Sequence, residues 1–299
     1  MLAVKPGWNF YDRGITESLP RGLCFIGDPH LSTAQHKYCL DILSRAVRIA
    51  SHSRLVPVIL GNMFRSPREA TPALFSGLFR IFRKSLYRPI ANLGSRDKHG
   101  AHLTPDCALW VLAESGAVSV MRNTRTQALL IALEDGPIAL YTVPHGQDVP
   151  HTIESLCAPE RTVVVTHKDL DCGEVCLGTK AIHEIRGASS LVNEHGRDIQ
   201  GQRIPGATVC VNPGNILRRA DAIRAHEPAV WSWRPGQRVP ERHLLHLLPA
   251  TPVFELTAIS DDQLATGMAE DGAFDDGRET RPLYELEQET LQEAGRPSP

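Results

Sequence analysis

Apolar runs and amphipathic stretches alternate along the first part of the chain. Three short, mainly apolar runs have the length of buried strands: 23–26, 56–60 and 90–93, the last with Asn92 as its one polar residue. Apolar residues recur at helical spacing in three stretches between and after them: 35–51, 71–86 and 104–116. The second and third stretches open on Thr-Pro, a pair typical of an N-cap followed by proline in the first helical turn, and Ser32 or Thr33 is the expected cap of the first. This alternation predicts a parallel sheet covered by helices.

The second part of the chain has a different pattern, with short strand-like runs separated by turns. These runs are 118–121, 128–133, 138–143, 162–165, 190–193, 208–212, 231–233, 244–248 and 253–256. The last three are expected to close a sheet in antiparallel fashion. Together the two parts predict an α/β fold, a two-sheet sandwich flanked by helices, formed by one domain over residues 1–259.

Charge is distributed unevenly over the 299 residues. The formal net charge is −2, but eleven acidic residues against three arginines follow Ser260. The body of the chain is therefore mildly basic. We expect residues 260–299 to form an acidic, flexible tail. The alternative is a tail that folds back on a basic groove.

The cysteines and the apolar content indicate a soluble, cytoplasmic protein. Seven cysteines are scattered along the chain, and a reduced thiol in a strand behaves as a small hydrophobe. Cys172 and Cys176 are spaced too widely for a C-x-x-C knuckle, so a metal or redox role there is the minor alternative. No run of about 18 apolar residues occurs, and the sequence predicts no membrane contact.

Polar motifs close most of the predicted strands. Asp28-Pro-His30 follows the first strand, where a carboxylate and an imidazole two residues apart can turn toward one cation. Further motifs follow later strands: Gly61-Asn62, Gly94-Ser95-Arg96-Asp97, His167-Lys168-Asp169, Asn193-Glu194-His195-Gly196-Arg197 and Asn212-Pro213-Gly214-Asn215. Loops at the carboxyl ends of parallel strands converge on one rim, so these motifs predict a single site.

The order and spacing of these motifs resemble the calcineurin-like metallophosphoesterases, especially the branch that includes SbcD-type nucleases and small bacterial phosphoesterases. The family pattern is D-x-H, G-D, G-N-H-D, a strand ending in H, G-H-x-H, and N-P-G. The resemblance covers about residues 23–233 and implies a four-layer α/β/β/α fold. It also implies metal-dependent hydrolysis of phosphate mono- or diesters.

Several positions of this sequence depart from the family pattern. Asn62 stands where the family has a bridging Asp, Ser95 and Arg96 replace its Asn and catalytic His, and Arg197 replaces its last His. An amide bridges two cations poorly, and arginine does not ligate metal. We therefore expect at most one divalent ion (Mn, Fe or Zn), with no bound ion as the alternative, and weakened or lost hydrolysis.

The resemblance and the residues together assign candidate roles. The metal ligands are expected to be Asp28, His30, Asn62, His167 and His195; the catalytic residues Arg96, Asp97 and His145; and the substrate-binding residues Ser95, Arg197, Asn215 and Arg218. Arg96 and Arg197 are expected either to pair with Asp28 and Asp97 or to leave an arginine-lined pocket that binds phosphate without cleaving it.

The helix predicted at 71–86 offers a second surface. Arg80, Arg83, Lys84 and Arg88 are interleaved with Phe79, Phe82 and Tyr87. A nucleic-acid ligand is one interpretation; a buried aromatic face with solvated arginines is the other. Protein partners cannot be inferred from the sequence.

Overall fold

The computed structural model describes residues 8–12, 14, 16, 18–69, 71–100, 102–121, 127–168, 170–171, 180–181, 184–193, 202–203, 208–217, 227–237 and 239–245. All of them belong to the compact unit Met1–Glu255. The acidic tail predicted at 260–299 and the strand predicted at 253–256 lie outside the described residues, as does most of the one at 244–248.

A six-stranded sheet combines four strands from the first half of the chain with two from near residue 240. Its order is β15 (Glu241–Leu244), β14 (Ala229–Trp233), β2 (Gly22–Ile26), β3 (Leu55–Ile59), β4 (Ile90–Ala91) and β5 (Ser119–Val120). Strands β2 to β5 are parallel, whereas β14 and β15 pair antiparallel. The predicted parallel core and antiparallel closing strand are both present.

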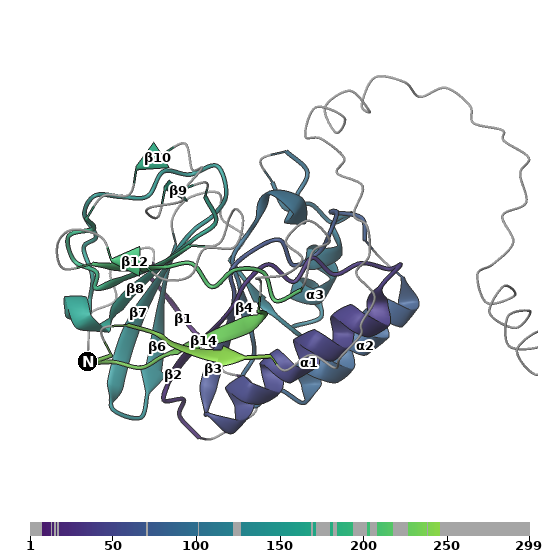
Figure 1. Cartoon of the computed structure of the whole chain (residues 1–299), viewed down its shortest axis with the longest axis horizontal. Helices are drawn as coiled ribbons and strands as arrows, with labels where there is room; N and C mark the ends of the chain where they lie inside the picture. The colour runs from purple at the N-terminus through teal and green to yellow at the C-terminus, as the bar shows by residue number, and fades with distance from the viewer. Residues whose placement is uncertain are drawn as a thin grey trace, which may run out of the picture. The chain divides into compact units, whose positions relative to one another are not determined.

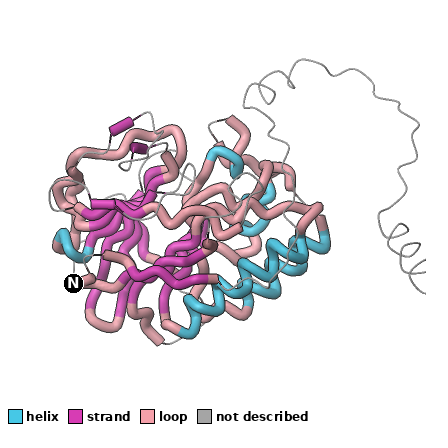
Figure 2. Tube along the Cα trace, viewed as in Figure 1, coloured by secondary structure: helices cyan, strands magenta, loops and turns pink. Residues whose placement is uncertain are grey.

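A seven-stranded sheet carries most of the second half. Its order is β1 (Trp8–Phe10), β6 (Gln127–Leu133), β7 (Gly136–Val143), β8 (Thr162–Thr166), β11 (Ser190–Asn193), β13 (Val209–Val211) and β12 (Gln202–Arg203). Strands β7, β8, β11 and β13 run parallel. A separate pair joins β9 (Leu170–Asp171) to β10 (Lys180–Ala181). Figure 2 draws the strands of the two large sheets in magenta, with the short β9 and β10 pair apart from them.

Alternation along β2 shows how the layers are held together. Leu23 and Phe25 point between the two sheets, where they meet Leu129, Leu140 and other residues of the second sheet. The intervening Cys24 and Ile26 point to the helix side. A strand buried on both faces reads as a continuous apolar run, as the sequence indicated.

Helices cover the outer face of the six-stranded sheet. α1 (His36–His52), α2 (Pro72–Arg83) and α3 (Ala108–Glu114) pack their apolar sides into one core with this sheet, and α1 and α2 lie side by side (Figure 1). The Thr71 hydroxyl caps α2 by accepting the Leu74 N–H. The other two helices start later than predicted, α1 after Gln35 and α3 after Cys107, both without a side-chain cap.

The two-sheet α/β prediction is confirmed. Among the described residues, the outer face of the seven-stranded sheet is covered by the loop residues Val149, Ile153, Ile185 and Ala188. Among the described helices, none is both long and apolar enough to cross a bilayer.

Candidate functional site

Loops from both sheets meet beyond the carboxyl ends of the parallel strands. The loop after β2 reaches β8, because Asp28 Oδ1 lies 3.4 Å from His167 Nδ1. The loop after β13 reaches the same place, where the Ile216 N–H donates to Gly27 O at 3.2 Å. The loop after β4 joins the one after β7 through the His145 N–H and Leu93 O, 3.0 Å apart. The rim predicted from strand ends is therefore one site.

Asp28 is the centre of this site. Its side chain is almost fully buried, and its Oδ2 lies 2.9 Å from Asn62 Nδ2 and 3.4 Å from His30 Nε2. Burial raises the pKa of Asp28, but the His167 and His30 imidazoles and the Asn62 amide outweigh burial and bring it below its usual value. Three of the residues expected to bind metal, His30, Asn62 and His167, thus surround the carboxylate of a fourth.

Backbone conformation aims two of these side chains at Asp28. His30 and Asn62 both have positive φ, 42° and 40°, a region that costs energy for residues other than glycine. The two loops are fastened to each other, because the His30 N–H donates to Asn62 O and the Leu31 N–H to Met63 O. Such strained residues cluster at functional sites.

The Asn62 amide has a defined orientation. The Arg96 backbone N–H donates to Asn62 Oδ1 at 2.9 Å, and the Ser95 hydroxyl donates to the same oxygen at 3.4 Å. Since a backbone N–H can only donate, the amide oxygen faces Arg96 and the NH₂ group faces Asp28. Both polar ends of this side chain are therefore occupied within the protein.

Asp97 accepts hydrogen bonds from the backbone of the site. It is buried, and its two oxygens accept the N–H groups of Gly94 (2.9 Å) and Phe64 (3.3 Å), which belong to different loops. Burial raises the pKa of Asp97 to about 7 even though these N–H groups lower it, and the Asp28 charge raises it further. In this geometry Asp97 connects the loops after β3 and β4, whereas a catalytic role was predicted for it from the sequence.

The raised pKa of Asp97 predicts a pH-dependent stability. The unfolded chain releases this proton at about pH 4 and the folded chain at about pH 7. Between these values the folded state holds the extra proton, so the free energy of unfolding falls as pH rises. Asp97→Asn is expected to remove this slope in denaturant titrations, with exposed Asp41→Asn as the control. A difference between wild type and Asp97→Asn that stays constant across this pH window would contradict the assignment.

Arg96 lies beside the site but does not pair with its carboxylates. Its Nη1 donates to Arg65 O at 3.4 Å, and it forms no ion pair with Asp28 or Asp97, which are both described. Of the two alternatives given for this arginine, pairing with the carboxylates is not seen, because its side chain reaches a backbone carbonyl of the neighbouring loop instead. His195, Arg197 and Arg218 lie outside the described residues.

The remaining candidates border the cluster. The His145 ring lies 6.1 Å from the His167 ring in an edge-on arrangement. Asn215 is buried one residue before Ile216, whose N–H contacts the Asp28 loop. Lys98 was missed by the sequence analysis: its buried Nζ donates to His145 O at 2.8 Å, and burial lowers its pKa. The one sequence feature that could have indicated Lys98 is its position directly after Asp97.

The donor atoms suit one ion better than two. Asp28, His30 and His167 make a mixed carboxylate and imidazole set of the kind that transition ions accept. Asp28 Oδ1 is buried and accepts no hydrogen bond from a described residue. The two imidazoles, however, approach opposite oxygens of Asp28. Their donor atoms would have to draw together around a shared ion.

Among the described residues, three donor atoms of His, Cys, Asp or Glu lie within 4.8 Å of one another only at His99, Asp106 and Cys107. This group is separate from the Asp28 cluster and was not foreseen. No protein-family model matches the chain, and no curated protein matches it either.

Proposed function

We propose that the chain is a calcineurin-like metallophosphoesterase homologue whose hydrolysis of phosphate mono- or diesters is weak or lost. The observation that carries this proposal is the position of Asn62. Its amide lies 2.9 Å from Asp28, on the side where two-metal chemistry needs a second carboxylate.

Two-metal hydrolysis depends on a negative bridge between cations about 3.5–4 Å apart. Asn62 brings no charge, and its oxygen is already bonded to Ser95 and the Arg96 backbone. Asp97 cannot substitute, since both of its oxygens accept backbone N–H groups. Within the described site, one carboxylate remains for metal, which supports at most one ion.

One ion (Mn, Fe or Zn) would be held by Asp28, His30 and His167. When bound, it would act as a Lewis acid and lower the pKa of a coordinated water. The chain's own residues provide little general acid catalysis beside it. The Arg96 guanidinium is a poor proton donor at neutral pH, and the remaining candidate is His145, whose ring lies 6.1 Å from that of His167.

The test compares wild type with a variant that restores the family pattern: Asn62→Asp, Ser95→Asn, Arg96→His and Arg197→His. Both proteins are purified with manganese, analysed for bound metal and assayed on a generic phosphodiester. We expect only the restored variant to hold two ions that are lost in Asp28→Ala, and only this variant to turn over substrate clearly. Two ions in wild type that are both lost in Asp28→Ala, or equal turnover in both proteins, would overturn the proposal. Asp28→Ala in the restored background is the control for contaminating activity.

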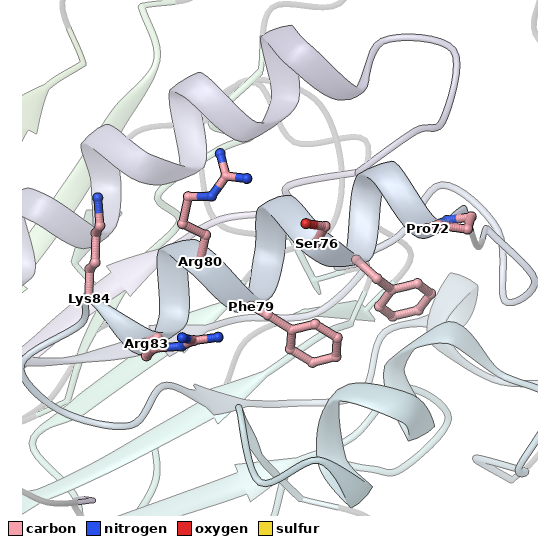
Figure 3. Close-up of a pocket in the computed structure, with 7 residues that line it drawn as sticks. Pro72, Ser76, Phe79, Arg80, Arg83 and Lys84 are labelled. Atoms are coloured by element: carbon pink, nitrogen blue, oxygen red, sulfur yellow. The ribbon is translucent and has the colours of Figure 1, made fainter.

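A second candidate function, binding of single-stranded nucleic acid without cleavage, is favoured by the outer face of α2. Two adjacent rows with helical i, i+4 spacing line an open cavity of about 660 Å³: Phe75, Phe79 and Arg83 in one, and Pro72, Ser76, Arg80 and Lys84 in the other (Figure 3). The two phenylalanine rings stack with centroids 6.0 Å apart and are only partly buried.

The charges on this face suit phosphate. Arg80, Arg83 and Lys84 are exposed, and none of them forms an ion pair with another residue that the structure describes. The observed basic and aromatic surface on α2 is smaller than the one predicted from the sequence. Phe82 and Tyr87 are buried in the core, and Arg88 is paired with Asp12 at 2.7 Å.

Arg80→Ala with Arg83→Ala is expected to weaken binding of a fluorescent single-stranded oligonucleotide. Each phosphate contact contributes a salt slope of about −0.7, so the double variant should flatten the slope of log affinity against log salt by about 1.4. Arg21→Ala with Arg45→Ala removes the same charge from arginines paired with Glu134 and Asp41 and is the control. Equal salt slopes in the two double variants would exclude α2 as the binding surface.

A further inference from the structure

A second group of metal-ligating side chains lies in the loop that leads into α3. We propose that His99, Asp106 and Cys107 bind one zinc-like divalent ion, at a site distinct from the Asp28 cluster. His99 Nε2 lies 3.2 Å from Asp106 Oδ2, and one donor atom from each of the three residues lies within 4.8 Å of the others.

These spacings are close to those around a tetrahedral ion. With zinc–ligand bonds of about 2.0 Å to nitrogen or oxygen and about 2.3 Å to sulfur, neighbouring donor atoms lie about 3.3–3.6 Å apart. The imidazole and carboxylate already have this separation. The thiol sulfur lies within 4.8 Å of both, so it would have to approach them by about 1.3 Å at most.

The local fold explains why the three side chains meet. His99 starts a tight turn that is closed by the His102 N–H donating to His99 O at 3.2 Å, with Gly100 at a φ of 57°. The Thr104 hydroxyl bonds to Asp106 Oδ1 and lies 3.4 Å from Cys107 Sγ. Thr104 therefore orients the carboxylate and the thiol, instead of capping α3 as its sequence suggested.

The environments of the donors suit a bound ion with one open position. The Cys107 side chain is buried, and His99 Nε2 is shielded from water without a well-directed hydrogen bond to any described residue. Asp106 is exposed and gives access from solvent. Its other partner, Arg68, has a side chain that is 76% exposed and is held at 3.5 Å, so it can swing away.

The donor types select the ion. Thiolate and imidazole favour zinc, cobalt or similar ions over magnesium and calcium, which prefer oxygen. His99 follows Asp97 by two residues and Cys107 directly precedes α3. An ion here would therefore link the loop after β4, which contains Asp97 and His99, to the start of α3.

Cobalt(II) titration of the reduced, chelator-treated full chain tests this proposal. A cysteine ligand gives a thiolate-to-cobalt charge-transfer band in the near ultraviolet, and the Asp28 cluster contains no cysteine, so the band reports only on a thiolate site. We expect the band in wild type to be complete within two equivalents, because the Asp28 cluster can take up the other ion. In Cys107→Ser and in the more exposed His99→Gln, we expect it to be lost or cobalt affinity to fall by about 100-fold or more.

Controls separate this site from the other thiols. Cys157→Ser, a partly exposed cysteine that does not belong to the group, should leave the band intact, as should Cys172→Ser with Cys176→Ser. A wild-type chain with no band, a band that survives in both Cys107→Ser and His99→Gln, or one lost only in the Cys172 and Cys176 variant would overturn the proposal. Circular dichroism verifies that each variant is folded.

Discussion

Asn62→Asp is expected to make the stability of the chain depend strongly on a divalent cation. The substitution places a second carboxylate where the Asn62 NH₂ group now lies 2.9 Å from Asp28 Oδ2, and both side chains are buried. Two buried carboxylates this close cannot both ionise without a cation or a shared proton. Without metal, the lost hydrogen bond and the repulsion should lower the free energy of unfolding by about 3–5 kcal/mol.

Metal should reverse this loss. An ion between the two carboxylates turns repulsion into coordination, and a cation at 100 times its dissociation constant adds about 2.7 kcal/mol. Thermal denaturation in chelator and in manganese measures both effects. Asn62→Gly tolerates the positive φ of this position and removes the amide without adding charge, so its loss should not be rescued by manganese. Equal manganese shifts in Asp and Gly variants would contradict the model of a missing bridge.

The helices and strands were predictable because burial leaves a pattern of apolar residues in the sequence. Strands buried on both faces read as continuous apolar runs, and β2, β3, β8 and β13 all lie where such runs were found. The site followed from the rule that polar residues at the ends of parallel strands share one rim. That rule brought together Asp28, Asn62 and His167, which are far apart in sequence.

Side-chain direction was not predictable from the same pattern. The sequence left open whether Arg96 pairs with the carboxylates or lines a pocket, and its side chain extends to Arg65 O; Asp97 turns to two backbone N–H groups. These outcomes depend on loop conformation, which has no period in sequence. The same holds for Thr104 and Pro105, whose residue types match a helix start but which form a turn ahead of α3.

Gly94→Ala is expected to be among the most destabilising single substitutions in the described site. An added Cβ would lie 2.3 Å from Asn62 N and 2.4 Å from Asn62 Oδ1, although the φ of −87° at Gly94 is acceptable for alanine. The clash involves backbone, which cannot move without breaking the β3 loop. Overpacking of this kind costs about 3 kcal/mol or more. The displaced Asn62 would also lose its contact with Asp28.

Gly77→Ala provides a matched comparison. The added Cβ would meet its nearest atom at the same distance, 2.3 Å, in both variants, but that atom belongs to a different kind of neighbour. In Gly77→Ala the Cβ would lie 2.3 Å from Leu40 Cδ1, the end of a flexible side chain. Alanine also favours the interior of α2 by about 1 kcal/mol. We therefore expect Gly77→Ala to be nearly neutral in denaturant titration and Gly94→Ala to be severe. Similar losses in both variants would mean that the Asn62 loop yields as readily as a leucine side chain, and that the amide is not held rigidly against Asp28.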